Sequence, residues 1–273
     1  MAYIKYSVSS KNLTGELVDI LIAQLSELGC ESFEEDDASL NLFLPENNHN
    51  EKAITLFLDQ MLLEWSKVHI EDKNWNAEWE QGFREIRVDD RVMIKADFHK
   101  PENPTNYVID IHPKMAFGTG HHETTRLMIR RMLQCDLVDK SVLDWGTGSG
   151  VLAIFAEKRK AASVNAIDTD DWAINNTREN ISINNCKLIE TAKGSLDKAS
   201  GAYDVVLANI NMNTLLDNAG ELKKKVKKGG CLLISGFYTS DLPRINDQIR
   251  KYGLNFEDSL QENDWCVAYF VNL

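Results

Sequence analysis

Three glycines at alternate positions could bring a cofactor against bare main chain. Gly146, Gly148 and Gly150 follow a short apolar stretch and the carboxylate of Asp144, and an apolar run from Val151 to Ala156 comes directly after them. Glycine permits a tight turn, and the N-terminus of a following helix attracts polar or anionic groups. The pattern predicts a buried strand, a glycine turn and a helix start. Such turns serve nicotinamide, flavin and S-adenosylmethionine proteins, and they also occur without a ligand.

A second carboxylate favours the cofactor interpretation. Residues 162–168 are a short, mostly apolar stretch that ends in Asp168. A βαβ unit places a ribose-binding carboxylate about 20 residues after its glycine turn, which is where Asp168 lies. The two features together therefore predict a nucleotide-type cofactor rather than a plain turn.

A glycine-bearing, hydroxyl-rich stretch, residues 113–125, runs into an amphipathic helix and could form a second loop over the ligand. His112, His121 and His122 lie in or beside it. Adjacent histidines project in different directions, and the spacing matches no zinc-binding pattern. We therefore expect no metal site here.

The elements that must position these residues alternate regularly after Asp168. A strongly apolar strand over residues 203–210 ends at the side-chain amide of Asn209, at the edge where open α/β sheets bind ligands. The other expected elements are helices over 172–184, 215–226 and 242–252 and strands over 187–191, 231–235, 254–260 and 265–271, the last two forming an antiparallel pair. A mostly parallel sheet with helices on both faces and a terminal antiparallel hairpin is the methyltransferase form of the doubly wound fold, not the dehydrogenase form.

The first third of the chain has a different pattern. Its expected order is βαββαβ, the split, ferredoxin-like pattern, and it carries no catalytic constellation. We interpret residues 1–71 as a recognition domain, 72–91 as a helical linker with Trp75, Trp79 and Phe83 on one face, and 92–273 as the catalytic domain. The expected elements of the first part are strands over 3–9, 30–35, 40–44 and 67–70 and helices over 13–28 and 52–65, and strands over 92–96 and 107–111 follow the linker.

Composition excludes several classes of protein. The 273 residues carry a net charge of −12, which disfavours a phosphate-binding surface and suits a basic protein partner. The five lysines among residues 223–228 are expected at a helix end, not in a nucleic-acid patch. Five scattered cysteines indicate reduced core residues of a cytoplasmic protein. No apolar run is long enough to span a bilayer, and the N-terminus does not have a signal-peptide pattern.

The motifs resemble those of a known family. Phe117-Gly118-Thr119-Gly120-x-His122-x-Thr124-Thr125, the Asp144–Gly150 turn, Ile167-Asp168-x-Asp170 and Ala208-Asn209-Ile210 are similar to the ribosomal protein L-eleven methyltransferases (PrmA), and the likeness extends loosely into the first third. Trp145 and His121 depart from the usual residues of the pattern. The resemblance implies a seven-stranded class I methyltransferase domain behind a small ferredoxin-like domain.

The resemblance also implies the cofactor, the substrate and the site. S-adenosylmethionine would be bound by Thr125, Gly146, Asp168 and Asn209, with Phe117, Gly118, Thr119, Asp144 and Gly148 around them. Asp168 would accept both ribose hydroxyls, and the amide oxygen of Asn209 would orient the acceptor amine. The substrate would be amino groups of a basic ribosomal protein, at lysine side chains and the N-terminal amine, held by the N-terminal domain.

Other functions remain open at this level. One is a class I methyltransferase that acts on another protein, RNA or a small molecule, although Asn209-Ile210-Asn211-Met212 lacks the two prolines and aromatic residue of amide and base methylases. A nicotinamide-dependent oxidoreductase is disfavoured by Asp144 and by the terminal hairpin. A non-catalytic ribosome-assembly factor that binds the cofactor only for shape would be separated by a turnover assay.

Overall fold

The structure is a computed structural model, and it describes residues 3–9, 13, 15–35, 39–48, 50–70, 84–101, 103–112 and 118–273. The chain forms two compact units, one within residues 1–78 and the other within residues 79–273. Each unit has a hydrophobic core of its own. None of the helices in these residues is long and apolar enough to cross a membrane.

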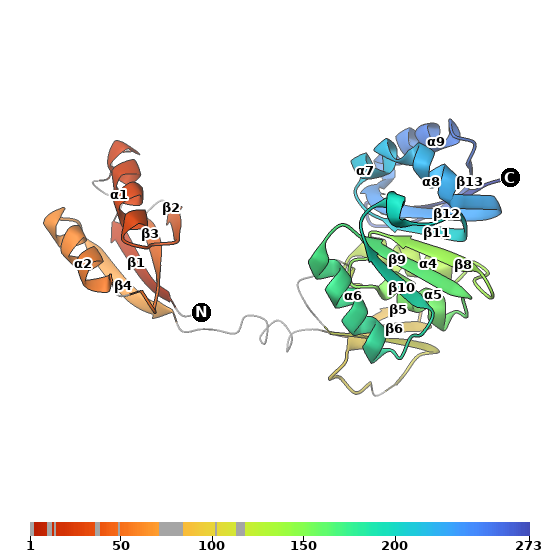
Figure 1. Ribbon diagram of the computed structural model, residues 1–273, viewed down its shortest axis with the longest axis horizontal. Helices are drawn as coiled ribbons and strands as arrows, with labels where there is room; N and C mark the ends of the chain where they lie inside the picture. Colours follow the sequence, from red (N-terminus) through yellow and green to blue (C-terminus); the bar gives the residue numbers. More distant parts are fainter. Residues whose placement is uncertain are drawn as a thin grey trace. The chain divides into compact units, whose positions relative to one another are not determined.

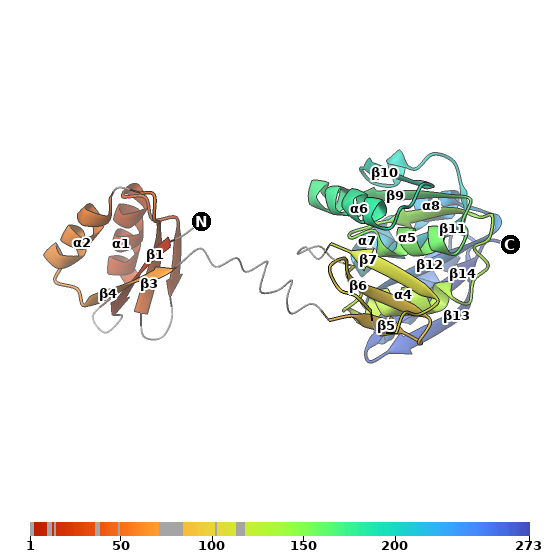
Figure 2. The same cartoon turned by 90° about the horizontal axis from the view of Figure 1, so that it is seen from below.

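The first unit is a four-stranded antiparallel sheet with two helices against one face (Figure 2). Its elements follow the expected βαββαβ order: β1 (Tyr3–Ser9), α1 (Gly15–Glu27), β2 (Ser32–Glu35), β3 (Ser39–Pro45), α2 (Glu51–Gln60) and β4 (Trp65–Ile70). The strands are arranged β2-β3-β1-β4. Alternate residues of β1, namely Ile4, Tyr6 and Val8, are buried beneath the helices, because successive strand side chains point to opposite faces.

Helix α2 is shorter than the periodicity of residues 52–65 predicts. It ends at Gln60, and Leu62 adopts the left-handed conformation with φ of 54°. A left-handed residue stops an α-helix, and the main-chain N–H of Leu63 returns to the carbonyl of Leu58. Trp65 consequently begins strand β4 instead of closing the helix.

The second unit is built on a seven-stranded sheet in the order β10-β9-β8-β11-β12-β14-β13 (Figure 1). The five strands β10, β9, β8, β11 and β12 run parallel to one another. Strand β14 is antiparallel to both of its neighbours, β12 and β13. The hairpin therefore folds back so that its second strand lies inside the sheet. The strands are β8 (Ser141–Trp145), β9 (Ser163–Asp168), β10 (Ile189–Lys193), β11 (Tyr203–Asn209), β12 (Val226–Tyr238), β13 (Asn255–Glu262) and β14 (Trp265–Val271).

Helices cover both faces of this sheet, as the doubly wound pattern predicts. One face carries α4 (Glu123–Met132), α5 (Val151–Lys158) and α6 (Asp171–Ile183), and the other carries α7 (Met212–Asp217), α8 (Ala219–Lys225) and α9 (Leu242–Arg250). Short 3-10 turns lie at Leu196–Lys198 and Thr239–Asp241. The expected single helix over 215–226 is interrupted at Asn218, whose side chain donates to the carbonyl of Thr214 at 2.9 Å, and residues 226–228 already belong to β12.

The prediction of a helical linker over residues 72–91 is wrong at the C-terminal end of that range. Its aromatic residues Trp75, Trp79 and Phe83 lie outside the described residues. Residues Ile86–Val88 form strand β5, which pairs antiparallel with β6 (Val92–Ala96), and β6 pairs parallel with β7 (Tyr107–Ile111). This small sheet completes one side of the second unit, because its apolar side chains need a partner surface that α4 and α5 provide.

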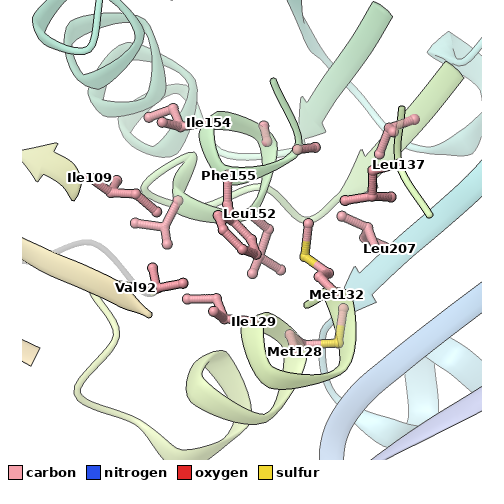
Figure 3. Packing of buried hydrophobic residues seen from close by; sticks show 14 of the residues in the cluster. Val92, Ile109, Met128, Ile129, Met132, Leu137, Leu152, Ile154, Phe155 and Leu207 are labelled. Atoms are coloured by element: carbon pink, nitrogen blue, oxygen red, sulfur yellow. The ribbon is translucent and has the colours of Figure 1, made fainter. Parts of the chain in front are cut away.

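Figure 3 shows the core that joins this small sheet to the large one. Val92 and Ile109 from the small sheet pack near Ile129 of α4 and Phe155 of α5, and Leu207 of β11 closes the far side. All of these side chains are fully buried. The rigid packing of α4 and α5 holds the loops that precede them at one edge of the sheet.

Candidate active site

A cavity of about 480 Å³ opens at the carboxyl ends of the parallel strands. It collects residues from the ends of β9, β8, β11, β12 and β14 and from nearby loops, which is where open α/β sheets bind ligands. Its lining comprises His122, Thr124, Trp145, Gly146, Gly148, Asp168, Thr169, Ser195, Asn209, Ile210, Asn211, Thr214, Gly236 and Trp265.

The glycine turn forms the floor of the cavity, and its geometry explains why glycine is needed. Gly146 has φ of 76°, and a Cβ atom there would lie 2.3 Å from the side chain of Ile210. Gly150 has φ of 82°, and a Cβ would lie 2.9 Å from the methyl group of Thr177. The main-chain N–H of Gly146 donates to the carbonyl of Ile167 at 2.8 Å, so the turn is fixed to the end of β9. A side chain at either glycine would displace its neighbour.

Asp168 stands at the end of β9 and lines the cavity. Its carboxylate accepts the main-chain N–H of Gly148 at 3.0 Å and that of Asp170 at 3.1 Å. The carboxylate of Asp170 instead caps helix α6, where it accepts the N–H of Trp172 at 2.9 Å. The two acids of the motif thus have separate roles: Asp168 faces the cavity, and Asp170 starts the helix.

Asn209 and Thr125 lie together, although 84 positions separate them in the chain. The amide of Asn209 donates to the hydroxyl of Thr125 at 3.4 Å, and both side chains are buried. Both also line a narrow cleft with Gly118 and Gly148. The amide oxygen of Asn209 has no hydrogen-bond partner among the described residues, which leaves a buried acceptor at the cavity wall. Buried acceptors in proteins are nearly always paired, so this oxygen suits a ligand's donor.

Asp144 lies beneath the turn and is fully buried. One carboxylate oxygen accepts the hydroxyl of Thr147 at 2.7 Å, and the other has no partner among the described residues. Burial raises the pKa of Asp144 to about 7, against the opposing hydrogen bond from Thr147, and the charge of nearby Asp168 adds to the rise. A positive charge on a bound ligand would favour the ionised form.

The second loop is only partly described. Phe117 lies outside the described residues. The carbonyl of Gly118 accepts the hydroxyl of Ser149 at 2.9 Å, which ties the loop to the glycine turn. The hydroxyl of Thr119 lies 3.2 Å from the ring of His121, and neither residue lines the large cavity. Burial, with the charge of Arg126, lowers the pKa of His121. His122 caps helix α4 through Nδ1, which accepts the N–H of Thr124.

Sequence reasoning missed several residues of the site. Asn180 of α6 is fully buried, accepts the N–H of His112 at 2.7 Å, and donates to the carbonyl of Ser149 at 2.8 Å. It therefore joins the end of β7 to the glycine turn, and only its place on an otherwise polar stretch of helix could have suggested this. Trp265 and Ser195 line the cavity without any motif around them. Among the described residues no group of three or more His, Cys, Asp or Glu side chains could hold a metal ion.

The sheet order with its single antiparallel strand, and the glycine turn and acid at its carboxyl edge, define a class I methyltransferase fold. A crystal structure of ribosomal protein L11 methylase from Lactobacillus delbrueckii subsp. bulgaricus superposes with a TM-score of 0.65 at 28% identity, covering 69% of this chain and 98% of that one. A methyltransferase from Pyrococcus furiosus shares the fold, with a TM-score of 0.51 at 19% identity over 59% of this chain and 88% of that one.

Residues 16–272 match the family described as Ribosomal protein L11 methyltransferase (PrmA), and the chain belongs to that family. A relative named ribosomal protein L11 methyltransferase from Porphyromonas gingivalis is 39% identical over 284 aligned positions, which cover 99% of this chain and 98% of the relative. A relative with the same name from Phocaeicola vulgatus is 37% identical over 279 positions, with 99% of each chain covered. The resemblance to this family is thereby confirmed.

Proposed function

We propose that this protein uses S-adenosylmethionine to methylate amino groups of ribosomal protein L11, at lysine side chains and at the N-terminal amine. The names of the relatives support the substrate. One structural observation carries the chemistry: the acid Asp168 and the unpaired oxygen of Asn209 lie in the wall of one cavity, on either side of the glycine turn.

The residues of the cavity fit this cofactor. Asp168 presents a charged acceptor for the two ribose hydroxyls, and Gly146 and Gly148 allow the main chain to approach the ligand. The unpaired oxygen of Asn209 is an acceptor at the cavity wall and suits a hydrogen-bond-donating group.

When bound, S-adenosylmethionine supplies an electrophilic methyl group attached to a positively charged sulfur. The sulfur is the leaving group and keeps the electron pair of the broken bond. The residues of the chain align the incoming amine and exclude water. The amide oxygen of Asn209 would accept a hydrogen bond from the amine and direct its lone pair, and proximity of this kind can supply much of the acceleration. Trp145 and Ile210 make that part of the lining apolar, and an apolar surrounding lowers the pKa of an amine from about 10.4 toward neutrality.

The first unit would hold the substrate protein. Its βαββαβ order and its strand arrangement support a ferredoxin-like domain. We propose residues 1–71 as this recognition domain and place the start of the catalytic domain before β5 rather than at residue 92. A chain that begins at Asp72 should bind S-adenosylmethionine normally and methylate intact L11 much more slowly, because remote contacts position the amine. Equal rates for the two chains would exclude a recognition role.

The experiment that tests the function is methyl transfer from labelled S-adenosylmethionine to purified L11. We expect label in L11, and Asn209→Ala should lower the single-turnover rate about tenfold to a hundredfold while changing cofactor affinity less. Cofactor binding without any turnover would favour the non-catalytic assembly factor. A stable Asn209→Ala variant with normal single-turnover chemistry would exclude the orienting role of Asn209.

The remaining alternative is a different acceptor. Mass spectrometry of ribosomal proteins from cells with and without this chain should show methyl mass lost from one basic protein. Loss from RNA instead would contradict the proposal.

All five cysteines are free in the structure, which suits the reducing cytoplasm in which ribosomes work.

A further inference from the structure

The cavity extends well beyond the part assigned to the cofactor. Asp168 ends β9, whereas Trp265 begins β14, four strands further along the sheet. Four strand spacings of about 4.8 Å place these two residues roughly 19 Å apart along the same edge. Because β14 is antiparallel to the others, its first residue lies at the edge where β12 ends, and Trp265 pairs there with Tyr238. The end of the cavity near Trp265 is thus separate from the ribose-binding end.

Three aromatic rings stand at that end. The rings of Trp265 and His122 meet edge to face, with centroids 4.6 Å apart and planes at 72°. The rings of Trp265 and Tyr238 are 4.4 Å apart and tilted by 37°. Trp265 and His122 line the cavity. Tyr238 lies at the solvent-exposed end of the cluster, with 49% of its surface exposed. His122, Trp265 and Tyr238 form what we call the ring wall.

The ring wall is held in place by the main chain around it. His122 is fixed as the cap of α4, and the N–H of Tyr238 donates to the carboxylate of Asp241 at 3.2 Å. The carbonyl of Asp264 accepts the N–H of Thr239 at 2.8 Å and so ties the hairpin turn to the end of β12. Rings that do not have to rearrange bind a ligand without a large ordering cost.

Acidic residues lie beside two of the rings: the carboxylate of Asp241 accepts the N–H of Tyr238, and Asp264 precedes Trp265 in the chain. Asp241 and Asp264 flank Tyr238 and Trp265 in the sequence, and neither carboxylate forms an ion pair with a basic side chain in the described part of the chain. Arg126 and Arg130, the cations on the adjacent face of α4, both bind Glu262. Aromatic faces attract cations, and they bind alkylated ammonium groups especially well because such groups hold water weakly. Aromatic rings beside acidic residues therefore match an alkylated ammonium group, not an anion or a nucleic acid.

We propose that the ring wall receives the acceptor amine and retains it as it gains methyl groups, an inference that rests on the proposed function. The first two transfers each end with a proton lost from nitrogen to water, which restores the lone pair. The third leaves a fixed positive charge with three methyl groups. Each added methyl group increases the contact between the amine and the rings while its hydration weakens. The ring wall therefore supports the later transfers more than the first.

The test compares two forms of L11 as substrates for the full-length protein: unmodified L11, and L11 whose lysines have been dimethylated chemically. Trp265→Leu should lower kcat/KM for the dimethylated protein about threefold to thirtyfold, and that for the unmodified protein much less. Trp265→Phe, which keeps a ring, should restore most of the loss. Phe256→Leu is the matched control, because Phe256 forms an aromatic pair with Phe270 on β13 and β14 outside the cavity.

The outcomes separate this inference from the proposed function. Wild-type protein that transfers no methyl group to either form of L11 would refute the proposed function and this inference with it. Equal losses on the two substrates for Trp265→Leu, or no recovery with Trp265→Phe, would overturn the ring wall alone. If the Trp265 variants do not fold, Tyr238→Leu at the exposed end of the ring wall replaces them and should show the same preference. Calorimetry should give unchanged S-adenosylmethionine affinity for every variant, and a parallel loss of affinity would also overturn the ring wall.

Discussion

The buried carboxyl of Asp144 should make the free energy of unfolding depend on pH, and Asp144→Asn should remove that dependence. Burial raises the pKa of Asp144 from 3.8 to about 7 in the folded protein. Between these two values the folded state holds a proton that the unfolded state has released. Stability contributed by this group is therefore complete below pH 3.8 and is lost as the pH rises toward 7.

The size of the effect follows from the same values. Between pH 5 and the pKa of about 7, each pH unit lowers the free energy of unfolding by about 1.4 kcal/mol. Asp144 should therefore lower the free energy of unfolding by about 3 kcal/mol between pH 5 and pH 8. Asn keeps an oxygen that can accept the hydroxyl of Thr147, and it does not ionise. The stability of Asp144→Asn relative to wild type should therefore rise by about 3 kcal/mol over this range.

Urea unfolding of the cofactor-free protein, followed by tryptophan fluorescence at pH 5 and pH 8, measures this difference. Asp204→Asn is the control. Hydrogen bonds from Ser141 and Lys227 overcome partial burial and lower the pKa of Asp204 to about 2, so its contribution is constant above pH 5. This variant should be less stable than wild type by the same amount at both pH values.

Cofactor binding supplies a second measurement. Ionised Asp144 favours a positively charged ligand, so wild-type affinity for S-adenosylmethionine should rise between pH 5 and pH 8, and that of Asp144→Asn should rise less. Parallel pH dependence of wild type and Asp144→Asn in unfolding would refute the assignment of a raised pKa to this carboxyl.

Three further substitutions test the rest of the site. Asp168→Ala should weaken S-adenosylmethionine binding by about 1.5–3 kcal/mol without unfolding the protein, and unchanged affinity in calorimetry would remove Asp168 from the site. Gly146→Ala should lower both Tm and cofactor affinity, because its Cβ would meet Ile210. Gly201→Ala is the control: its φ is 74°, and no atom lies within 4 Å of the added Cβ. It should therefore show only the effect of backbone strain. Equal losses for the two glycines would contradict the close approach. Asn180→Ala should lower the free energy of unfolding by about 1–3 kcal/mol for each partner it leaves buried and unpaired, and denaturation showing wild-type stability would exclude the bridge from α6 to the glycine turn.

Local features of the sequence determined much of this protein. The apolar stretches before Gly146 and Asp168 and the strand ending at Asn209 are interpreted correctly from neighbouring residues alone, because strand burial and glycine turns are decided over a few positions. The alternation of helix and strand after Asp168 also led to the doubly wound sheet and its terminal hairpin. The same local rules failed where one residue changed the backbone, as at Leu62 and Asn218.

Only the tertiary structure decided which distant side chains share the cavity and in what state they are held. Trp265 reaches the site because β14 lies between β12 and β13, and that register depends on pairing across the whole sheet. Asn180 and Thr125 acquire their partners from segments 31 and 84 positions away, contacts that no local periodicity describes. The carboxyl of Asp144 is an ordinary acid in the sequence, and its raised pKa arises because packing around the glycine turn removes water from it.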